Sequence, residues 1–153
     1  MAAAQHAVAL AMAEGDVVLQ ALANHQLGRA YHYQGDYHRA VDCFGQAVAF
    51  FDGAGCHERF GQVFLPAVNS RGWLAWCYAE LGAFAEGRAL GDEALRIAEA
   101  VDHPASVMIA SWGLGLLALR QGDLPRALSL LERAMSLCQE ADLPTNFPWM
   151  AEP

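Results

Sequence analysis

The chain has 153 residues, of which 55% are hydrophobic and 17% are charged, and its net charge is −8 at pH 7. That length suits one domain, and the hydrophobic content suits helices that are buried on more than one side. The net negative charge disfavours nucleic acid as a partner. The basic residues, all arginine, are also scattered along the chain and form no patch.

Apolar residues recur with helical spacing along the chain, and no alternating strand pattern competes with them. We therefore expect an all-α fold with about seven helices. The first of them reads as the second half of a unit whose first half is missing. The helices are expected at about residues 3–14, 16–33, 37–51, 59–81, 84–101, 104–120 and 124–141.

Three glycines, Gly35, Gly82 and Gly122, mark the turns of three helix hairpins and lie 47 and 40 residues apart. A glycine at such a turn can adopt the positive φ that ends one helix, and the next residue can cap another. Spacing of this kind indicates a stacked repeat of about forty residues. The chain divides into a half unit (1–15), three units (16–57, 58–103 and 104–143) and a tail or truncated start of a fourth unit (144–153).

The first unit resembles the tetratricopeptide repeat family, because it has the residue types of the family pattern at the matching positions: Leu27, Gly28, Tyr31, Ala40, Phe44 and Ala47. The resemblance extends over about residues 21 to 142. It implies a right-handed superhelical solenoid of antiparallel helix pairs. Gly87 and Gly91 depart from the family pattern in the second unit, and we expect them to loosen the local packing.

Pro66 lies inside the first helix expected for the second unit, about residues 59–81. A proline there either kinks the helix or delays its start. After Pro144, the tail reads as the opening of a further unit, and no polar capping helix follows. Association through an uncapped end, or docking of the tail on the last helix pair, is therefore a hypothesis.

Catalytic patterns are missing from the sequence. There is no G-x-S-x-G, and a P-loop is excluded because the chain has no lysine. His25, His32 and His38 lie close in sequence, but the first two are seven residues apart and the H-x-x-x-H spacing of helical zinc sites is missing. No cysteine has a histidine in helical phase, although distant pairs stay open. We expect no enzyme activity, no catalytic residue, no metal and no cofactor.

Tryptophans recur on the first helices of two units, with Trp73 and Trp76 in one and Trp112 in the next. In the resembled family these helices line the concave face, and aromatic and arginine side chains make binding hot spots. Burial between repeats is the alternative for the tryptophans, and it is favoured for Trp73 and Trp112. The residues that the resemblance places on the concave face are His25, Arg29, His32, Asn69, Trp73, Trp76, Trp112 and Leu116.

These observations favour a non-enzymatic interaction module that binds a peptide or a neighbouring domain. The face lacks the set of lysines and asparagines with which some family members clamp a C-terminal carboxylate, so a more apolar helix or extended peptide fits better. The spacing, and the stretch from Trp73 to Gly82 in particular, looks like the repeat region of large bacterial adenylate cyclase/ATPase signalling proteins. The alternatives are a regulatory ligand sensor and a self-assembly element that stacks through its open ends.

The first residues lack the cationic region of a secretory signal. The longest uncharged stretch, Pro104 to Leu119, is shorter than the roughly 20 residues that span a bilayer. We therefore expect a cytoplasmic protein that has no membrane partner. The four cysteines form no C-x-x-C pair and are expected to be reduced.

Overall fold

The structure is a computed structural model that describes residues 1–140. These residues form seven α-helices and one short 3-10 helix and contain no strand, which confirms the predicted all-α fold. The expected tail, residues 144–153, lies outside the described residues. The helices are α1 (Ala2–Glu14), α2 (Val17–Tyr33), α3 (Tyr37–Phe50), η1 (Gly53–His57), α4 (Pro66–Glu80), α5 (Phe84–Ala100), α6 (Pro104–Gln121) and α7 (Leu124–Glu140).

Local sequence signals set most of the helix ends. Gly35, Gly82 and Gly122 have φ angles of 77°, 78° and 83°, a conformation that side chains with a Cβ disfavour. Asp16 and Asp36 each accept a hydrogen bond from the backbone N–H three residues further on, at 2.9 and 3.2 Å. These carboxylates cap α2 and α3 by satisfying N–H groups that lack a partner within the helix.

Residues 58–65 form a loop, whereas the sequence placed a helix from about residue 59 and left open a start delayed by Pro66. Helix α4 begins at Pro66, so the proline delays the start of the helix and does not kink it. Phe60 and Gly61 have φ angles of 47° and 74°, which a helix does not accommodate. The end of this loop is fixed by the backbone N–H of Leu65, which donates to Ser106 Oγ of α6 at 2.8 Å.

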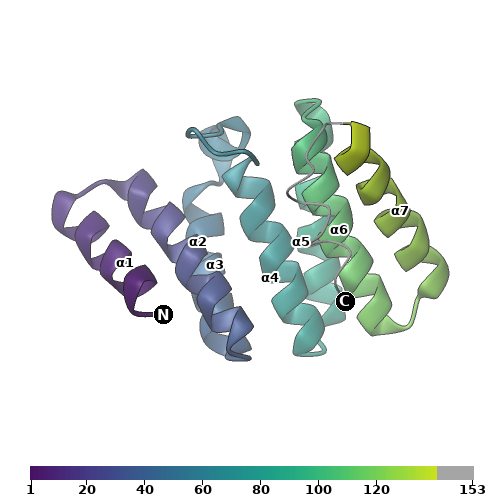
Figure 1. Cartoon of the computed structure of the whole chain (residues 1–153), viewed down its shortest axis with the longest axis horizontal. Helices are drawn as coiled ribbons and strands as arrows, with labels where there is room; N and C mark the ends of the chain where they lie inside the picture. The colour runs from purple at the N-terminus through teal and green to yellow at the C-terminus, as the bar shows by residue number, and fades with distance from the viewer. Residues whose placement is uncertain (141–153) are drawn as a thin grey trace.

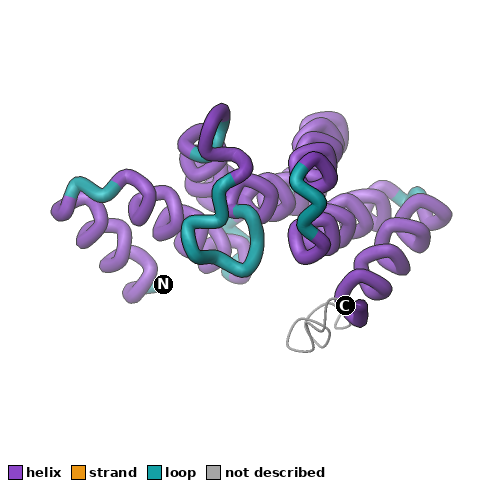
Figure 2. The backbone as a smooth tube through the Cα atoms, turned by 90° about the horizontal axis from the view of Figure 1, so that it is seen from above, coloured by secondary structure: helices purple, strands orange, loops and turns teal. Residues whose placement is uncertain are grey.

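The helix pairs follow one another along the molecule, the two helices of each pair are antiparallel, and α1 packs against α2 (Figure 1). Seen from above, the row of helix pairs is curved, and α1 and α7 lean toward the side on which loop 58–65 lies (Figure 2). Contacts link each pair to the next, since α3 packs on α4, α4 on α6 and α5 on α6. This arrangement is the solenoid of antiparallel helix pairs that the resemblance implied. Within the described part, no helix has the length and apolarity that a bilayer crossing needs.

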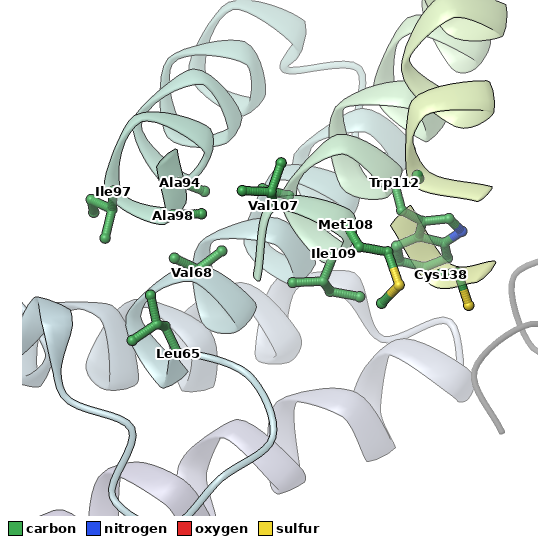
Figure 3. Packing of buried hydrophobic residues seen from close by; sticks show 12 residues of the cluster. Leu65, Val68, Ala94, Ile97, Ala98, Val107, Met108, Ile109, Trp112 and Cys138 are labelled. Carbon is green, nitrogen blue, oxygen red and sulfur yellow. The ribbon is translucent and has the colours of Figure 1, made fainter. Parts of the chain in front are cut away.

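The largest core lies between the second and third helix pairs (Figure 3). Val68 of α4, Ile97 of α5, Met108 of α6 and Cys138 of α7 all belong to it and are buried. Because residues from four helices share one apolar cluster, removing one pair would expose the next. Stability in such a fold is therefore shared between neighbouring pairs.

Gly87 and Gly91 do not loosen the packing, and that expectation is wrong. A Cβ built at Gly91 would lie 2.4 Å from Leu114 Cδ2, and one at Gly87 would lie 2.5 Å from Leu117 Cδ1. The space that a larger residue of α5 would have taken is filled by leucines of α6. The second unit therefore packs as closely as the first, with the bulk supplied from the following helix.

Arg71 of α4 is buried, which the sequence did not predict. Its side chain is 2% exposed and forms ion pairs with Asp52, which precedes η1, and with Glu93 of α5, whose Oε2 lies 3.4 Å from Nε. Its Nη1 donates to the carbonyl of Ala67 at 3.0 Å. Both carboxylates reach solvent. Through them, the buried guanidinium links two parts of the fold, the chain segment that follows α3 and helix α5.

Candidate functional site

The eight residues predicted for the concave face lie on the first helices of three pairs. Within each helix they are three or four positions apart, which places them on one side of that helix. We call the surface that these helices form the concave face. Helix α2 carries His25, Arg29 and His32, helix α4 carries Asn69, Trp73 and Trp76, and helix α6 carries Trp112 and Leu116.

Aromatic rings join the three helices. The centroid of the Trp76 ring lies 4.2 Å from that of His32, 5.1 Å from that of Trp73 and 4.9 Å from that of Trp112. The rings of Trp76 and Trp112 are nearly perpendicular, at 89°. Such edge-to-face pairs stabilise beyond their buried area. The structure therefore brings four of the eight predicted residues into one aromatic cluster, formed by His32, Trp73, Trp76 and Trp112.

The eight residues fall into two groups, four that are buried and four that are partly exposed. Trp73 is 2% exposed and Trp112 is 5% exposed, which agrees with the buried alternative that the sequence favoured for both. His25 and His32 are buried as well. The remaining four predicted residues are partly exposed: Arg29, Asn69, Trp76 and Leu116. Whether any of the eight residues contacts a partner stays a prediction.

His25 organises the polar part of this face. Burial and, to a smaller extent, the charge of Arg29 lower its pKa to about 3, so the imidazole is neutral at pH 7. Its Nδ1 lies 2.9 Å from Ser70 Oγ, and its Nε2 lies 3.4 Å from Asn69 Nδ2. Because an amide nitrogen only donates, Nε2 is the acceptor and Nδ1–H donates to Ser70. The amide oxygen of Asn69 then has no hydrogen-bond partner among residues 1–140.

His32 and Cys77 form a histidine–cysteine contact that the sequence left open as a distant pair. The His32 Nδ1 lies 3.3 Å from Cys77 Sγ, although the residues are 45 positions apart. Burial lowers the pKa of His32 to about 4, against a smaller raising effect of Glu80. Burial also raises the pKa of the Cys77 thiol to about 12. Both groups are therefore neutral at pH 7, and the thiol lacks the thiolate character of a catalytic nucleophile.

Arg29 is held over the face of Trp73, with its guanidinium carbon 5.2 Å from the ring centroid. Its Nη1 donates to Gln26 Oε1 at 3.3 Å, while its buried Nε has no hydrogen-bond partner in the described chain. A cation over an indole face is attracted by the ring and restricted in its motion. The guanidinium is thus positioned, with part of its donor capacity unused.

Trp76 lies at the exposed edge of the aromatic cluster. Its Nε1 donates to Glu80 Oε1 at 2.9 Å, and Arg120 Nε of α6 donates to the same oxygen at 2.9 Å. These bonds fix the indole orientation and link α4 to α6. The partly exposed ring is therefore a rigid apolar surface at the middle of the face.

A groove with a cavity volume of about 440 Å³ lies beside this cluster. It contains three of the predicted residues, His25, Arg29 and Asn69. Loop 58–65 forms one wall, which was not predicted because the sequence placed most of these residues in a helix. Gly61 and Pro66 are the signals that could have identified the loop. The groove is lined by Ala7, Leu19, Leu22, Ala23, His25, Gln26, Arg29, Gln62, Val63, Phe64, Pro66 and Asn69.

Metal ligands do not gather on this face. Across residues 1–140, no three His, Cys, Asp or Glu side chains lie close enough together to hold a metal ion. His25 and His32 both face neighbours in the core, Ser70 and Cys77. The features that this face offers to a ligand are therefore its shape, its aromatic surface and its hydrogen-bonding groups.

Two sequence models described as tetratricopeptide repeat match the chain, one over residues 21–53 and the other over residues 67–140. No curated protein matches it significantly. Among solved structures it is similar to two crystal structures of the nearly identical TPR-like repeats of a Podosopora anserina protein described as a kinesin light chain. Their TM-scores are 0.66 and 0.63, at 21% and 22% sequence identity. Each alignment covers 88% of this chain and 63% of the other chain, and at this identity the likeness concerns the fold alone.

Proposed function

We propose that this chain, which belongs to the tetratricopeptide repeat family, is a non-enzymatic interaction module that holds a segment of another protein on its concave face. Solenoids of this kind use their extended concave surfaces for binding. The eight predicted residues lie on that face or directly beneath it. The buried aromatic rings give the surface a rigid floor, and the partly exposed residues are available for contact.

The observation that carries this proposal is the groove between α1, α2, loop 58–65 and α4. Its walls include two apolar side chains that reach solvent, since Leu19 is 42% exposed and Val63 is 57% exposed. Beside them lie the polar side chains of Arg29 and Asn69, which line the same groove. Exposed apolar walls with a few directed polar groups are the composition of a binding site.

The test uses random peptides displayed on phage and selected on the immobilised chain. Selected peptides are synthesised, and their binding is measured by isothermal titration calorimetry. The Leu19→Ser/Val63→Ser variant should weaken binding about tenfold or more, because it removes apolar contact from the walls of the groove. The Leu128→Ser variant is the matched control, since Leu128 is 61% exposed on α7. Equal affinities for the two variants would refute the proposal.

A small regulatory ligand is the second candidate, because the cavity volume of about 440 Å³ also lies in the range of small-molecule sites. Fractionated metabolite pools titrated while tryptophan fluorescence is followed would separate this candidate from the first. A metabolite that binds in the groove and blocks every selected peptide would favour the sensor. A fluorescence response to peptides alone would favour the interaction module.

Self-assembly is favoured by one separate observation, the row of exposed apolar side chains Leu124, Leu128 and Met135 on α7. A second copy could cover this row. Sedimentation equilibrium over a wide range of protein concentration tests the idea. A strict monomer throughout would exclude association through α7.

The wider context is proposed from the sequence resemblance alone. We place the module in the cytoplasm, within a large bacterial signalling protein of the adenylate cyclase/ATPase kind, and with the unit boundaries expected above. Sequencing the encoding gene tests this placement. A reading frame that continues into cyclase and ATPase domains would support it, and a frame without them would contradict it.

A further inference from the structure

The groove contains one charge, which belongs to Arg29. Among the twelve lining residues there is no aspartate or glutamate, although the whole chain carries a net charge of −8. Arg29 also has no carboxylate within ion-pair distance among residues 1–140. Six other arginines do have such a partner: Arg39, Arg71, Arg96, Arg120, Arg126 and Arg133. The groove is thus a basic site on an acidic protein.

The Arg29 guanidinium is prepared to accept an anion. Its position over Trp73, 5.2 Å from the ring centroid, restricts its motion, and Gln26 occupies one of its donors. Its Nε is buried, so a ligand meets the outer nitrogens of the guanidinium. A carboxylate that joined the guanidinium would gain charge-assisted hydrogen bonds from donors that are already oriented.

Neighbouring groups extend this site toward a peptide. The side chain of Asn69 lines the same groove, and its amide nitrogen faces His25. Leu19 and Val63 expose apolar surface on the walls, and Phe64 lies partly exposed beside them. A ligand that fits these groups combines a carboxylate and a large apolar side chain.

We infer that the groove binds a protein segment in which an acidic side chain lies close to a large apolar one. The carboxylate bonds to Arg29, and the apolar side chain packs on Leu19 and Val63. This inference rests on the proposed function and names the partner's chemistry. Binding of this kind requires one guanidinium, and not the set of lysines and asparagines that binds a C-terminal carboxylate in some family members.

The experiment starts from the peptides selected on the wild-type chain, which should be enriched in Asp or Glu near Trp, Phe or Leu. The tightest peptide is compared with its Glu→Gln or Asp→Asn form by calorimetry. A hydrogen bond to a charged group corresponds to a preference of roughly 10- to 100-fold for the acidic form. That preference should shrink as salt is added.

Three protein variants identify the source of the preference. In Arg29→Gln the two peptide forms should bind about equally, because the guanidinium is gone while the apolar walls remain. Arg29→Lys should keep part of the preference, since it retains the charge but loses the planar fork. Arg39→Gln is the matched control, because Arg39 also lies over an aromatic ring, that of Tyr31 at 5.6 Å, but is paired with Asp36. Circular dichroism confirms that each variant is folded.

The outcomes separate this inference from the proposed function. If Arg29→Gln keeps the full preference, or if the selected peptides carry no acidic residue, the inference is overturned while binding on the face stands. If free N-acetylglutamate competes as strongly as the peptide, the site takes small acids and not protein segments, which also overturns it. If no peptide is enriched at all, the proposed function fails and the inference fails with it.

Discussion

Gly91 of α5 and Leu114 of α6 allow a sharp test of how the second and third helix pairs pack. A Cβ at position 91 would lie 2.4 Å from Leu114 Cδ2 and 2.7 Å from Cγ, where ordinary contacts are 3.4–4 Å. Leu114 is buried and must therefore move by about 1 Å, which costs about 1–3 kcal/mol in a packed core. Alanine in place of a helical glycine recovers about 1 kcal/mol. On balance, Gly91→Ala should destabilise the fold by about 1 kcal/mol.

The sign should reverse in a Leu114→Ala background. That substitution alone should destabilise by about 3–5 kcal/mol, because it removes a buried leucine and leaves a cavity. Once the leucine is gone, the methyl group that Gly91→Ala introduces meets no obstacle and partly fills the space. Gly91→Ala should then stabilise the Leu114→Ala chain by about 1 kcal/mol.

Urea denaturation of the four chains, followed by circular dichroism, gives the free energy of unfolding for each. Gly113→Ala is not a suitable control, since its Cβ would meet the backbone of Gly72 at 3.2 Å. Gly45→Ala is suitable, because it lies in helix α3 and nothing stands within 4 Å of its built Cβ. It should stabilise both backgrounds equally. If Gly91→Ala stabilises the wild-type chain as much as Gly45→Ala does, the packing argument is wrong.

Buried and partly buried groups give four further predictions. Burial lowers the pKa of His25 to about 3 and that of His32 to about 4, so below about pH 6.5 the unfolded chain binds protons that the folded chain does not. As the pH is lowered from about 6.5 toward these folded-state pKa values, the free energy of unfolding should therefore fall by about 1.4 kcal/mol per pH unit for each histidine. In urea titrations at several pH values, a His25→Gln/His32→Gln variant should show a smaller dependence on pH. Arg71→Ala should destabilise by about 2–5 kcal/mol through loss of its buried stem, and Arg71→Met by less; equal melting temperatures would contradict this. Trp76→Ala should weaken peptide binding about tenfold or more in calorimetry, and unchanged affinity would remove the aromatic cluster from the binding surface. Iodoacetamide labelling followed by mass spectrometry should modify the partly exposed Cys56 well before Cys77, whose buried thiol has a pKa of about 12; equal rates would contradict its burial.

Helix number and most helix ends were predictable from the sequence. A glycine at positive φ, an aspartate that caps the next helix and a proline in the first turn act on the backbone of a few neighbouring residues. These effects do not depend on distant contacts. For residues 59–65 the sequence left two readings open, and the structure has the one in which Pro66 delays the helix; the positive φ angles of Phe60 and Gly61 exclude helix before it.

The residues of the concave face were predictable as a set, but their roles were not. Helical phase placed Trp73, Trp76 and Trp112 on related faces, and it could not say how deep each ring lies. The burial of each ring depends on how α2 and α6 pack against α4. In this packing Trp73 and Trp112 are buried and Trp76 is partly exposed.

The sequence by itself determined that the chain forms stacked helix pairs, because periodicity and turn residues act locally. Only the tertiary structure decided that Arg29 has no carboxylate beside it in the described chain, that His32 meets Cys77 and that loop 58–65 closes a groove. These features join residues tens of positions apart. Which of them meet depends on how closely the helices approach, and that distance is set by the fit of side chains such as Leu114 against Gly91.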